Sequence, residues 1–254
     1  MRYLPGKFVW FEHISNDAAK AKKFYSDLIG WSVQDMPMGD QTYGMLMNAG
    51  VSIGGFRTAG AGIPNCWTSY LSVLDADKSH AAAVAAGAKS LMAPFDMMGN
   101  GRTCALADPT GAAFCLWQGA RDDAADVEKT PFGGWFWNEL HSTDANAALA
   151  FYQKAFGYSV DSMDMGPMGM YHVLKGADGK MRGGLMQASP QMTMPSNWLP
   201  YIHVPDCDAA CAKAQQLGAV MVIMPPTDIP NVGRACVLLD ATGAAIGLIK
   251  GAGA

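Results

Sequence analysis

Apolar and polar positions near the start of the chain change from one regular pattern to another. Residues 7–14 are rich in aromatic and branched side chains, which predicts a β-strand. Asp17 follows at an N-cap position, and Gly30 is placed to end a helix. Between them, apolar residues recur every three or four positions, the spacing of one helix face: Ala18, Ala21, Phe24, Tyr25 and Leu28. A strand and an amphipathic helix are therefore the first predicted elements.

Short β-favouring stretches separated by Gly, Pro and Asn residues follow this helix. They predict strands at 31–36, 43–48 and 51–57. The same order of elements then recurs, with a strand at 67–74, an alanine-rich helix at 77–86 that ends at Gly87, and strands near 89–93, 102–107 and 113–118. The first part of the chain is thus predicted to contain two βαβββ units.

The chain also matches itself at an offset of 127 residues, half of its 254-residue length, and small insertions increase the offset by a few residues further along. The matched segments keep their order and include Trp10-Phe11-Glu12 with Trp137-Asn138-Glu139, Phe24-Tyr25 with Phe151-Tyr152, and the Asp-x-Thr-Gly-Ala-Ala segments that begin at Asp108 and Asp240. We therefore predict an α+β protein of four βαβββ units in two homologous domains, residues 1–118 and 134–254, joined by a polar linker at 119–133.

Composition narrows the expected partners. Half of the residues are hydrophobic, 16% are charged and the net charge is −4. The chain has no cluster of Lys and Arg, so we expect it to bind neither nucleic acid nor an anionic membrane. A small-molecule ligand or substrate is expected instead. No apolar run is long enough to span a membrane, and the N-terminus lacks the apolar core of a secretion signal, so we expect a cytoplasmic protein.

Six cysteines are spread along the chain, and we expect them to be reduced thiols. Cys207 and Cys211 lie one helical turn apart. Small residues on a helix face are the expected interpretation of this pair, with a shared metal or a bridge as the alternative.

The repeated segments resemble those of the vicinal oxygen chelate superfamily, which includes glyoxalases, bleomycin-resistance proteins and extradiol dioxygenases. The resemblance rests on Asp17-x6-Phe24-Tyr25-x4-Gly30-Trp31, on its copy Asp144-x6-Phe151-Tyr152-x4-Gly157-Tyr158, and on the two Asp-x-Thr-Gly-Ala-Ala segments. It implies that paired βαβββ units form curved, mostly antiparallel sheets whose concave face holds a divalent metal. Single-domain relatives pair their units by dimerising, so the duplication favours a monomer, with a homodimer as the alternative.

The family's four metal-ligand positions fall in this chain on residues that do not suit a metal. They are Trp10 and Trp137, Thr68 and Leu199, Cys115 and Gly247, and the neighbourhood of Gly54-Gly55 and Gly183-Gly184. The resemblance therefore implies neither the usual metal site nor a metal-dependent activity, and we expect no cofactor. A different metal site made from Glu139, His141 and His203 remains an alternative.

Residues two apart on a strand lie on the same face of the sheet. The sequence therefore also predicts which side chains lie on the concave face together with the metal-ligand positions. In the second domain they are Glu139, His141, Tyr201 and His203, which suit acid–base catalysis centred on His203. The predicted ligand-binding residues are Trp10, Glu12, Tyr70, Trp137 and Cys115, together with Arg102 and Arg234 in two matched loops.

Structural alternatives exist for several of these residues. Glu12 could cap backbone amides or pair with an arginine, and the same holds for Glu139. Arg102 and Arg234 could brace their loops by pairing with Asp96 and Asp228.

Three functions fit this sequence. The first is a metal-independent enzyme of lyase or isomerase type that acts on a small aromatic or carbonyl compound. The second is a binding protein that sequesters a planar hydrophobic molecule between aromatic side chains. The third is a protein whose duplicated fold serves an interaction or structural purpose, with both cavities filled by their own side chains. Glu139 and His203 share a cavity only if units pair within a domain and are not exchanged between domains. His13 and His80 are expected at the surface.

Overall fold

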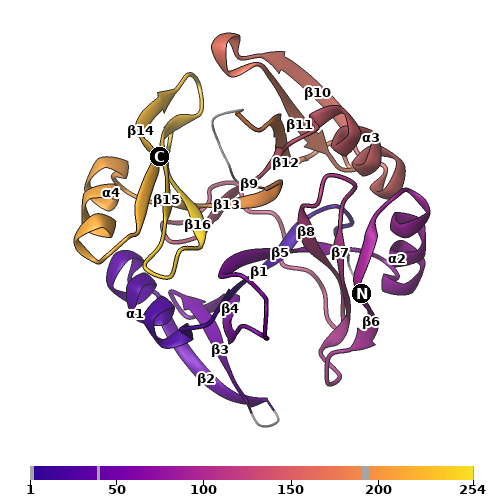
Figure 1. Ribbon diagram of the computed structural model, residues 1–254, viewed down its shortest axis with the longest axis horizontal. Coiled ribbons are helices and arrows are strands. Elements are labelled where there is room, and N and C mark those ends of the chain that lie inside the picture. Colours follow the sequence, from indigo (N-terminus) through magenta and orange to yellow (C-terminus); the bar gives the residue numbers. More distant parts are fainter. Residues whose placement is uncertain (1–2, 39–40, 190–194, 254) are drawn as a thin grey trace. The chain divides into compact units, whose positions relative to one another are not determined.

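The computed structural model describes residues 3–38, 41–189 and 195–253 (Figure 1). The elements of the first half are β1 (Phe8–Ser15), α1 (Ala18–Ile29), β2 (Ser32–Met38), β3 (Gln41–Asn48), β4 (Val51–Thr58), β5 (Cys66–Ser72), α2 (Ala76–Ala85), β6 (Lys89–Asp96), β7 (Gly101–Ala107) and β8 (Ala113–Gly119). Both predicted βαβββ units are therefore present, with boundaries shifted by at most three residues.

The second half repeats this order. Its elements are β9 (Trp135–Ser142), α3 (Ala145–Phe156), β10 (Ser159–Asp164), the 3-10 helix η1 (Gly166–Met168), β11 (Met170–Lys175), β12 (Met181–Gln187), β13 (Asn197–His203), α4 (Cys207–Gln216), β14 (Met221–Ile229), β15 (Gly233–Leu239) and β16 (Ala245–Gly251). The predicted α+β fold of tandem βαβββ units is confirmed. Among the described residues, no helix is long and apolar enough to cross a membrane.

The strands of each half form one mixed sheet of eight strands. The strand order is β2-β3-β4-β1-β5-β8-β7-β6 in the first half and β10-β11-β12-β9-β13-β16-β15-β14 in the second. Within each βαβββ unit the first and last strands are parallel neighbours, as in β1 with β4 and β9 with β12, and the hairpins are antiparallel. The crossover helix of each unit allows this parallel pairing.

Each of the four helices begins at an aspartate. Asp17 Oδ1 accepts a hydrogen bond from Lys20 N at 2.9 Å, as the sequence predicts, and the aspartates before α2, α3 and α4 do the same for their own helices. Helix α1 ends at Gly30, whose φ of 85° is the left-handed conformation that glycine adopts without strain.

Packing contacts divide the chain into two compact units, each of which takes one βαβββ segment from each half. Unit 1 consists of the described part of residues 1–10 with Ser69–Asp126 and Trp137–Trp198, and in it α2 contacts α3 (Figure 1). Unit 2 consists of Phe11–Thr68, Val127–Phe136 and the described part of residues 199–254, and in it α1 contacts α4.

Both units contain a buried aspartate from an Asp-x-Thr-Gly-Ala-Ala segment. In unit 1, Asp108 Oδ1 accepts hydrogen bonds from Thr110 N at 2.8 Å and Ala112 N at 3.1 Å, which close the turn. Its Oδ2 accepts a hydrogen bond from the hydroxyl of Tyr152, which lies on α3. The indole N–H of Trp198 donates to the same phenol oxygen at 2.8 Å. The repeated turn and the repeated Phe-Tyr pair thus hold helix and sheet together.

The matching aspartate of unit 2 has one more partner. Asp240 Oδ2 accepts a hydrogen bond from Tyr25 at 2.9 Å and lies 2.8 Å from Nε2 of His13. The expectation that His13 lies at the surface is wrong, because its side chain has no exposed area. His13 shares with the buried Phe11 the face of β1 that contacts helix α1. The carboxylate beside its imidazole comes from 227 residues further along the chain.

Candidate active site

Three side chains on β9 alternate along one face of the strand. Trp137, Glu139 and His141 are each two residues apart, so a strand places them on the same side. Glu139 is only 8% exposed, and Oε1 of its carboxylate lies 2.8 Å from Nε2 of His141. A carboxylate and an imidazole therefore lie next to each other within unit 1.

Tyr171, on β11, completes this group. The indole N–H of Trp137 donates to the Tyr171 oxygen at 2.7 Å, and the Tyr171 hydroxyl donates to Oε2 of Glu139 at 2.7 Å. The four residues form a continuous chain of contacts, which we call the Glu139 cluster: Trp137, Tyr171, Glu139 and His141. Sequence reasoning missed Tyr171. The neighbouring His172 lies outside this group, and its Nδ1 contacts the Ser162 hydroxyl at 2.7 Å.

The close approach of Tyr171 to Glu139 requires glycine on the strand between them. Gly184 of β12 pairs in register with Glu139 on one side and with Val173 of β11 on the other. A Cβ atom on Gly184 would lie 2.0 Å from the Tyr171 hydroxyl oxygen and 2.8 Å from the Trp137 indole nitrogen. The repeated Gly-Gly pair therefore makes room for the cluster. In the sequence, this Gly-Gly pair was the signal that a bulky side chain, here Tyr171, could lie across the strand.

Electrostatics assign different roles to the members of the cluster. Burial, and next the charge of Glu139, raises the pKa of the Tyr171 phenol well above its ordinary value, so this hydroxyl remains a proton donor. The side chain of His141 is 13% exposed, and its buried Nε2 makes no aligned hydrogen bond although the carboxylate oxygen is near. The imidazole is thus held beside a carboxylate without its proton being fixed in a well-aligned bond.

The corresponding position of the first half has a different partner. Glu12 is 4% exposed and accepts a hydrogen bond from Nε of Arg57 at 2.6 Å. The sheet register pairs Arg57 with Ile14 in the first half and Met186 with His141 in the second. Ile14 thus occupies the position of His141, and Arg57 occupies the position of Met186. The alternative in which the glutamate pairs with an arginine applies to Glu12, whereas Glu139 lies beside a histidine.

Tyr201 and His203 belong to unit 2, whereas Glu139 and His141 belong to unit 1. His203 is 4% exposed, and its Nδ1 donates to the backbone oxygen of Thr130 at 2.7 Å. Its ring contacts two phenylalanines, with centroid distances of 4.8 Å to Phe132 and 5.1 Å to Phe136. His203 therefore holds the segment before β9 against the end of β13.

The other predicted ligand-binding residues lie on strands and loops of both units. Tyr70 and Cys115 are buried neighbours on β5 and β8. Arg102 donates to Asp77 at 2.8 Å, in place of the expected Asp96, because Asp77 stands in the first turn of α2 beside β7.

Arg234 donates to Asp208 at 2.9 Å and to Asp228 at 3.0 Å. Both partners lie within unit 2, and Asp228 is the aspartate that the bracing alternative names. Both arginines are thus held by carboxylates of their own units.

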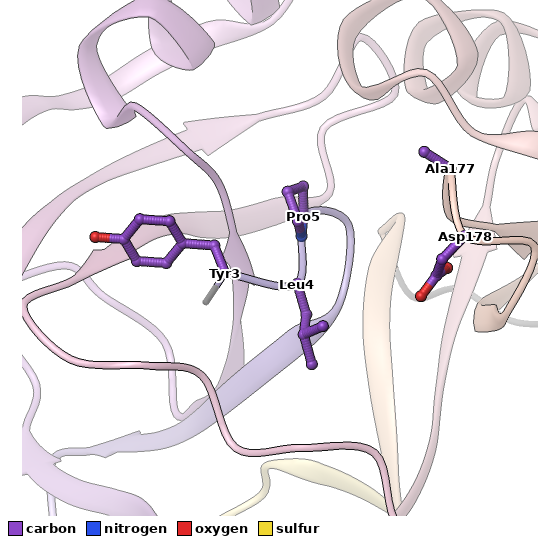
Figure 2. A pocket seen from close by; sticks show the side chains of 5 residues that line it. All are labelled: Tyr3, Leu4, Pro5, Ala177 and Asp178. Carbon is purple, nitrogen blue, oxygen red and sulfur yellow. The ribbon is translucent and has the colours of Figure 1, made fainter. Parts of the chain in front are cut away.

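A surface cavity of about 180 Å³ lies elsewhere in unit 1. Figure 2 shows the N-terminal Tyr3, Leu4 and Pro5 on one side of it and the Ala177–Asp178 turn on the other. Asp178, its one carboxylate, already accepts a hydrogen bond from Arg182. This cavity therefore has no acid–base pair of the kind that the Glu139 cluster contains.

The divalent metal implied by the superfamily does not fit this donor set. Among the described residues, no three His, Cys, Asp or Glu side chains are placed together to hold a metal. In the Glu139 cluster, Oε2 of Glu139 accepts from Tyr171, Oε1 contacts His141, and the indole of Trp137 is a donor. Only one carboxylate and one imidazole remain, fewer ligands than a protein metal site ordinarily supplies.

Comparisons with known proteins agree with this fold. Residues 10–117 match the model of a glyoxalase-like domain. The protein named "Putative glyoxylase CFP32" from Mycobacterium bovis is 36% identical, over 98% of this chain and 96% of its own. The anthracycline biosynthesis protein DauV from Streptomyces sp. is 31% identical, over 98% of this chain and 94% of its own.

Among solved structures, the Mn(II)-bound glyoxalase from Novosphingobium aromaticivorans superposes with a TM-score of 0.63 at 17% identity, covering 98% of this chain and 83% of the other. This likeness concerns the fold alone. Together with the full-length match to the mycobacterial protein, it places the chain among the glyoxalase-like proteins of the vicinal oxygen chelate superfamily.

Proposed function

We propose that the Glu139 cluster is the acid–base site of a metal-independent lyase or isomerase that acts on a small carbonyl or aromatic compound. The observation that carries this proposal is the chain of contacts from Trp137 through Tyr171 to Glu139 and His141. It joins a titratable imidazole to a carboxylate that is itself held from its other side.

His141 is the proton-transferring group in this proposal. Its imidazole removes a proton from a carbon next to a carbonyl group, which leaves an enolate, and then returns the proton to another atom of the substrate. Glu139, 2.8 Å away, stabilises the imidazolium that forms in between. Tyr171 holds the carboxylate in place and does not itself lose a proton, because its pKa is raised.

The experiment is hydrogen–deuterium exchange at carbon. The protein is treated with EDTA, and a panel of small α-hydroxy ketones and aryl ketones in D₂O is followed by proton NMR. We expect exchange with at least one probe, and a loss of about 100- to 10,000-fold in the variants H141Q and E139Q.

The matched control is E12Q, since Glu12 occupies the same place in the first half but pairs with Arg57. This variant should exchange at the wild-type rate. Exchange at the wild-type rate in H141Q would contradict the proposal. So would a loss of exchange after EDTA treatment if added manganese restored the exchange.

A second candidate function is the binding of a planar aromatic molecule without turnover. It is favoured by the half-buried Trp137 on the face of the cluster and by the similarity to a protein of anthracycline biosynthesis. Quenching of tryptophan fluorescence by a hydroxyanthraquinone, with a reduced response in W137F and no product, would support it. An unchanged spectrum at saturating probe concentration would contradict it.

A further inference from the structure

The first half of the chain shows what an arginine does at one position of this sheet. Arg57 of β4 lies in register with Ile14 of β1. From there its Nε donates to Oε2 of Glu12, two residues before Ile14, at 2.6 Å. The Glu12 side chain is 5% exposed and that of Arg57 is 31% exposed, so the pair joins a buried carboxylate to a half-buried guanidinium. An arginine at this position is therefore long enough to reach the glutamate and balance its charge.

Met186 occupies the same position in the second half. It lies in register with His141, and Glu139 lies in register with Gly184, so the pairing of β12 with β9 repeats that of β4 with β1. Neighbouring strands are about 4.8 Å apart, and side chains in register share a face of the sheet. The side chain of Met186 therefore stands beside the imidazole, on the face that carries the carboxylate, and it brings no charge there.

Two cations on the neighbouring strands have carboxylate partners. Lys175 of β11 contacts Asp161 at 2.9 Å, and Arg182 of β12 contacts Asp126 at 2.7 Å. On this face the cluster contributes a negative charge, and position 186 contributes no positive charge to balance it. An anionic ligand beside the imidazole would be repelled by that carboxylate, whereas an uncharged ligand would not.

We propose that Met186 determines the substrate class of the Glu139 cluster and restricts it to uncharged ketones with an aromatic group. This specificity rests on the proposed acid–base function of the cluster. Methionine is unbranched and polarisable, and Trp137 is half-buried on the same face, so both side chains suit an aromatic ring. With methionine at this position, the Glu139 carboxylate stays 2.8 Å from Nε2 of His141, where proton transfer needs it.

The test compares two ketones of similar size that differ in charge. Phenacyl alcohol is neutral, and benzoylformate has a carboxylate in place of the hydroxymethyl group. We expect isothermal titration calorimetry on the whole protein to give an affinity about tenfold or more higher for the neutral ketone. Equal affinities, tighter binding of benzoylformate, or no binding of either ketone would overturn the proposal.

Substitutions at position 186 separate charge from shape. M186R introduces the residue found at the equivalent position of the first half. Its guanidinium should bind Glu139 as Arg57 binds Glu12, which a crystal structure would show, and the preference for the neutral ketone should fall to about twofold or less. M186L changes shape without charge and should keep the preference. A preference that persists in M186R, or is lost in M186L, would show that position 186 does not select by charge.

R57M is the matched control, because it removes the corresponding cation from unit 2 and should leave the preference as in the wild type. Loss of the preference in R57M would overturn the assignment to Met186.

Exchange at carbon distinguishes this specificity from the function on which it rests. Binding with the expected preference, but without hydrogen–deuterium exchange in phenacyl alcohol, would support selection by Met186 and refute proton transfer by His141. Exchange together with equal affinities for the two ketones would support proton transfer and overturn the role of Met186.

Discussion

The hydroxyl of Tyr171 donates a hydrogen bond of 2.7 Å to Oε2 of Glu139, across the strand that carries Gly184. The opposite oxygen of the same carboxylate lies 2.8 Å from Nε2 of His141. A buried carboxylate that accepts the tyrosine's hydrogen bond on one oxygen keeps the other oxygen next to the imidazole, and such a fixed orientation is what an acid–base site requires.

The first prediction concerns Tyr171. In Y171F, the Trp137 indole N–H and one oxygen of Glu139 lose their partner, which should lower the free energy of unfolding by about 1 to 3 kcal/mol. As Glu139 becomes less well placed, kcat should fall by about 10- to 100-fold with little change in KM. Steady-state kinetics and urea unfolding measure both effects. A variant with wild-type kcat would show that Tyr171 is structural only.

The second prediction concerns the space that Gly184 provides. In G184A, the new methyl group overlaps the Tyr171 hydroxyl, and we expect a loss of about 1 to 3 kcal/mol of stability together with displacement of the tyrosine. Near-ultraviolet circular dichroism and thermal unfolding report on these changes. The control is G60A, because a Cβ there would meet only Ile63 Cδ1 at an ordinary contact distance of 3.4 Å. Equal effects in the two variants would contradict the close approach.

A third prediction concerns the buried pair of His13 and Asp240. In D240N the imidazole loses its carboxylate, and we expect roughly 3 to 5 kcal/mol of destabilisation at neutral pH. D108N is the control, because the aspartate of unit 1 has Tyr152 and no histidine on its outer oxygen, and its cost should be near 1 kcal/mol. Urea unfolding at pH 7 compares the two, and similar losses would show that His13 contributes little.

The same pair gives a pH dependence. Burial acts to raise the pKa of Asp240, but hydrogen bonding and charge from His13 outweigh it, so the folded-state pKa lies below its usual value. The stabilisation is therefore present above the unfolded-state pKa of about 4 and is lost as the pH falls through the folded-state value. The stability difference between wild type and D240N should accordingly shrink below about pH 4. A difference that grows at low pH would contradict this sign.

The fourth prediction separates the two candidate histidines of the second half. H203A removes a ring that contacts Phe132 and Phe136, so it should lower stability by about 3 kcal/mol while the surviving folded protein keeps its activity. H141Q should instead lose activity while its stability stays near that of the wild type. Activity assays at a temperature well below both unfolding midpoints make the comparison. Loss of activity in a fully folded H203A would instead support His203 as the proton-transferring group.

Several features of this protein follow from local sequence alone. Asp17 and Gly30 mark the ends of α1 because caps act over three or four residues, and alternation along β9 places Glu139 and His141 on one face because strand geometry has a period of two. The duplication and the family were visible because they depend on the order of short segments.

Contacts between residues far apart in the sequence needed the folded chain. The Tyr171 hydroxyl meets Glu139 only because β12 lies between β11 and β9 and carries glycine at the crossing point. His13 can be buried because a carboxylate 227 residues away provides a polar partner for its imidazole.

The sequence by itself thus determined the elements, the repeat and the candidate face, since these depend on neighbours along the chain. Only the tertiary structure decided which partner each polar side chain has. Burial makes an unpaired polar group costly, and the partner that removes this cost can come from any strand that the fold brings near.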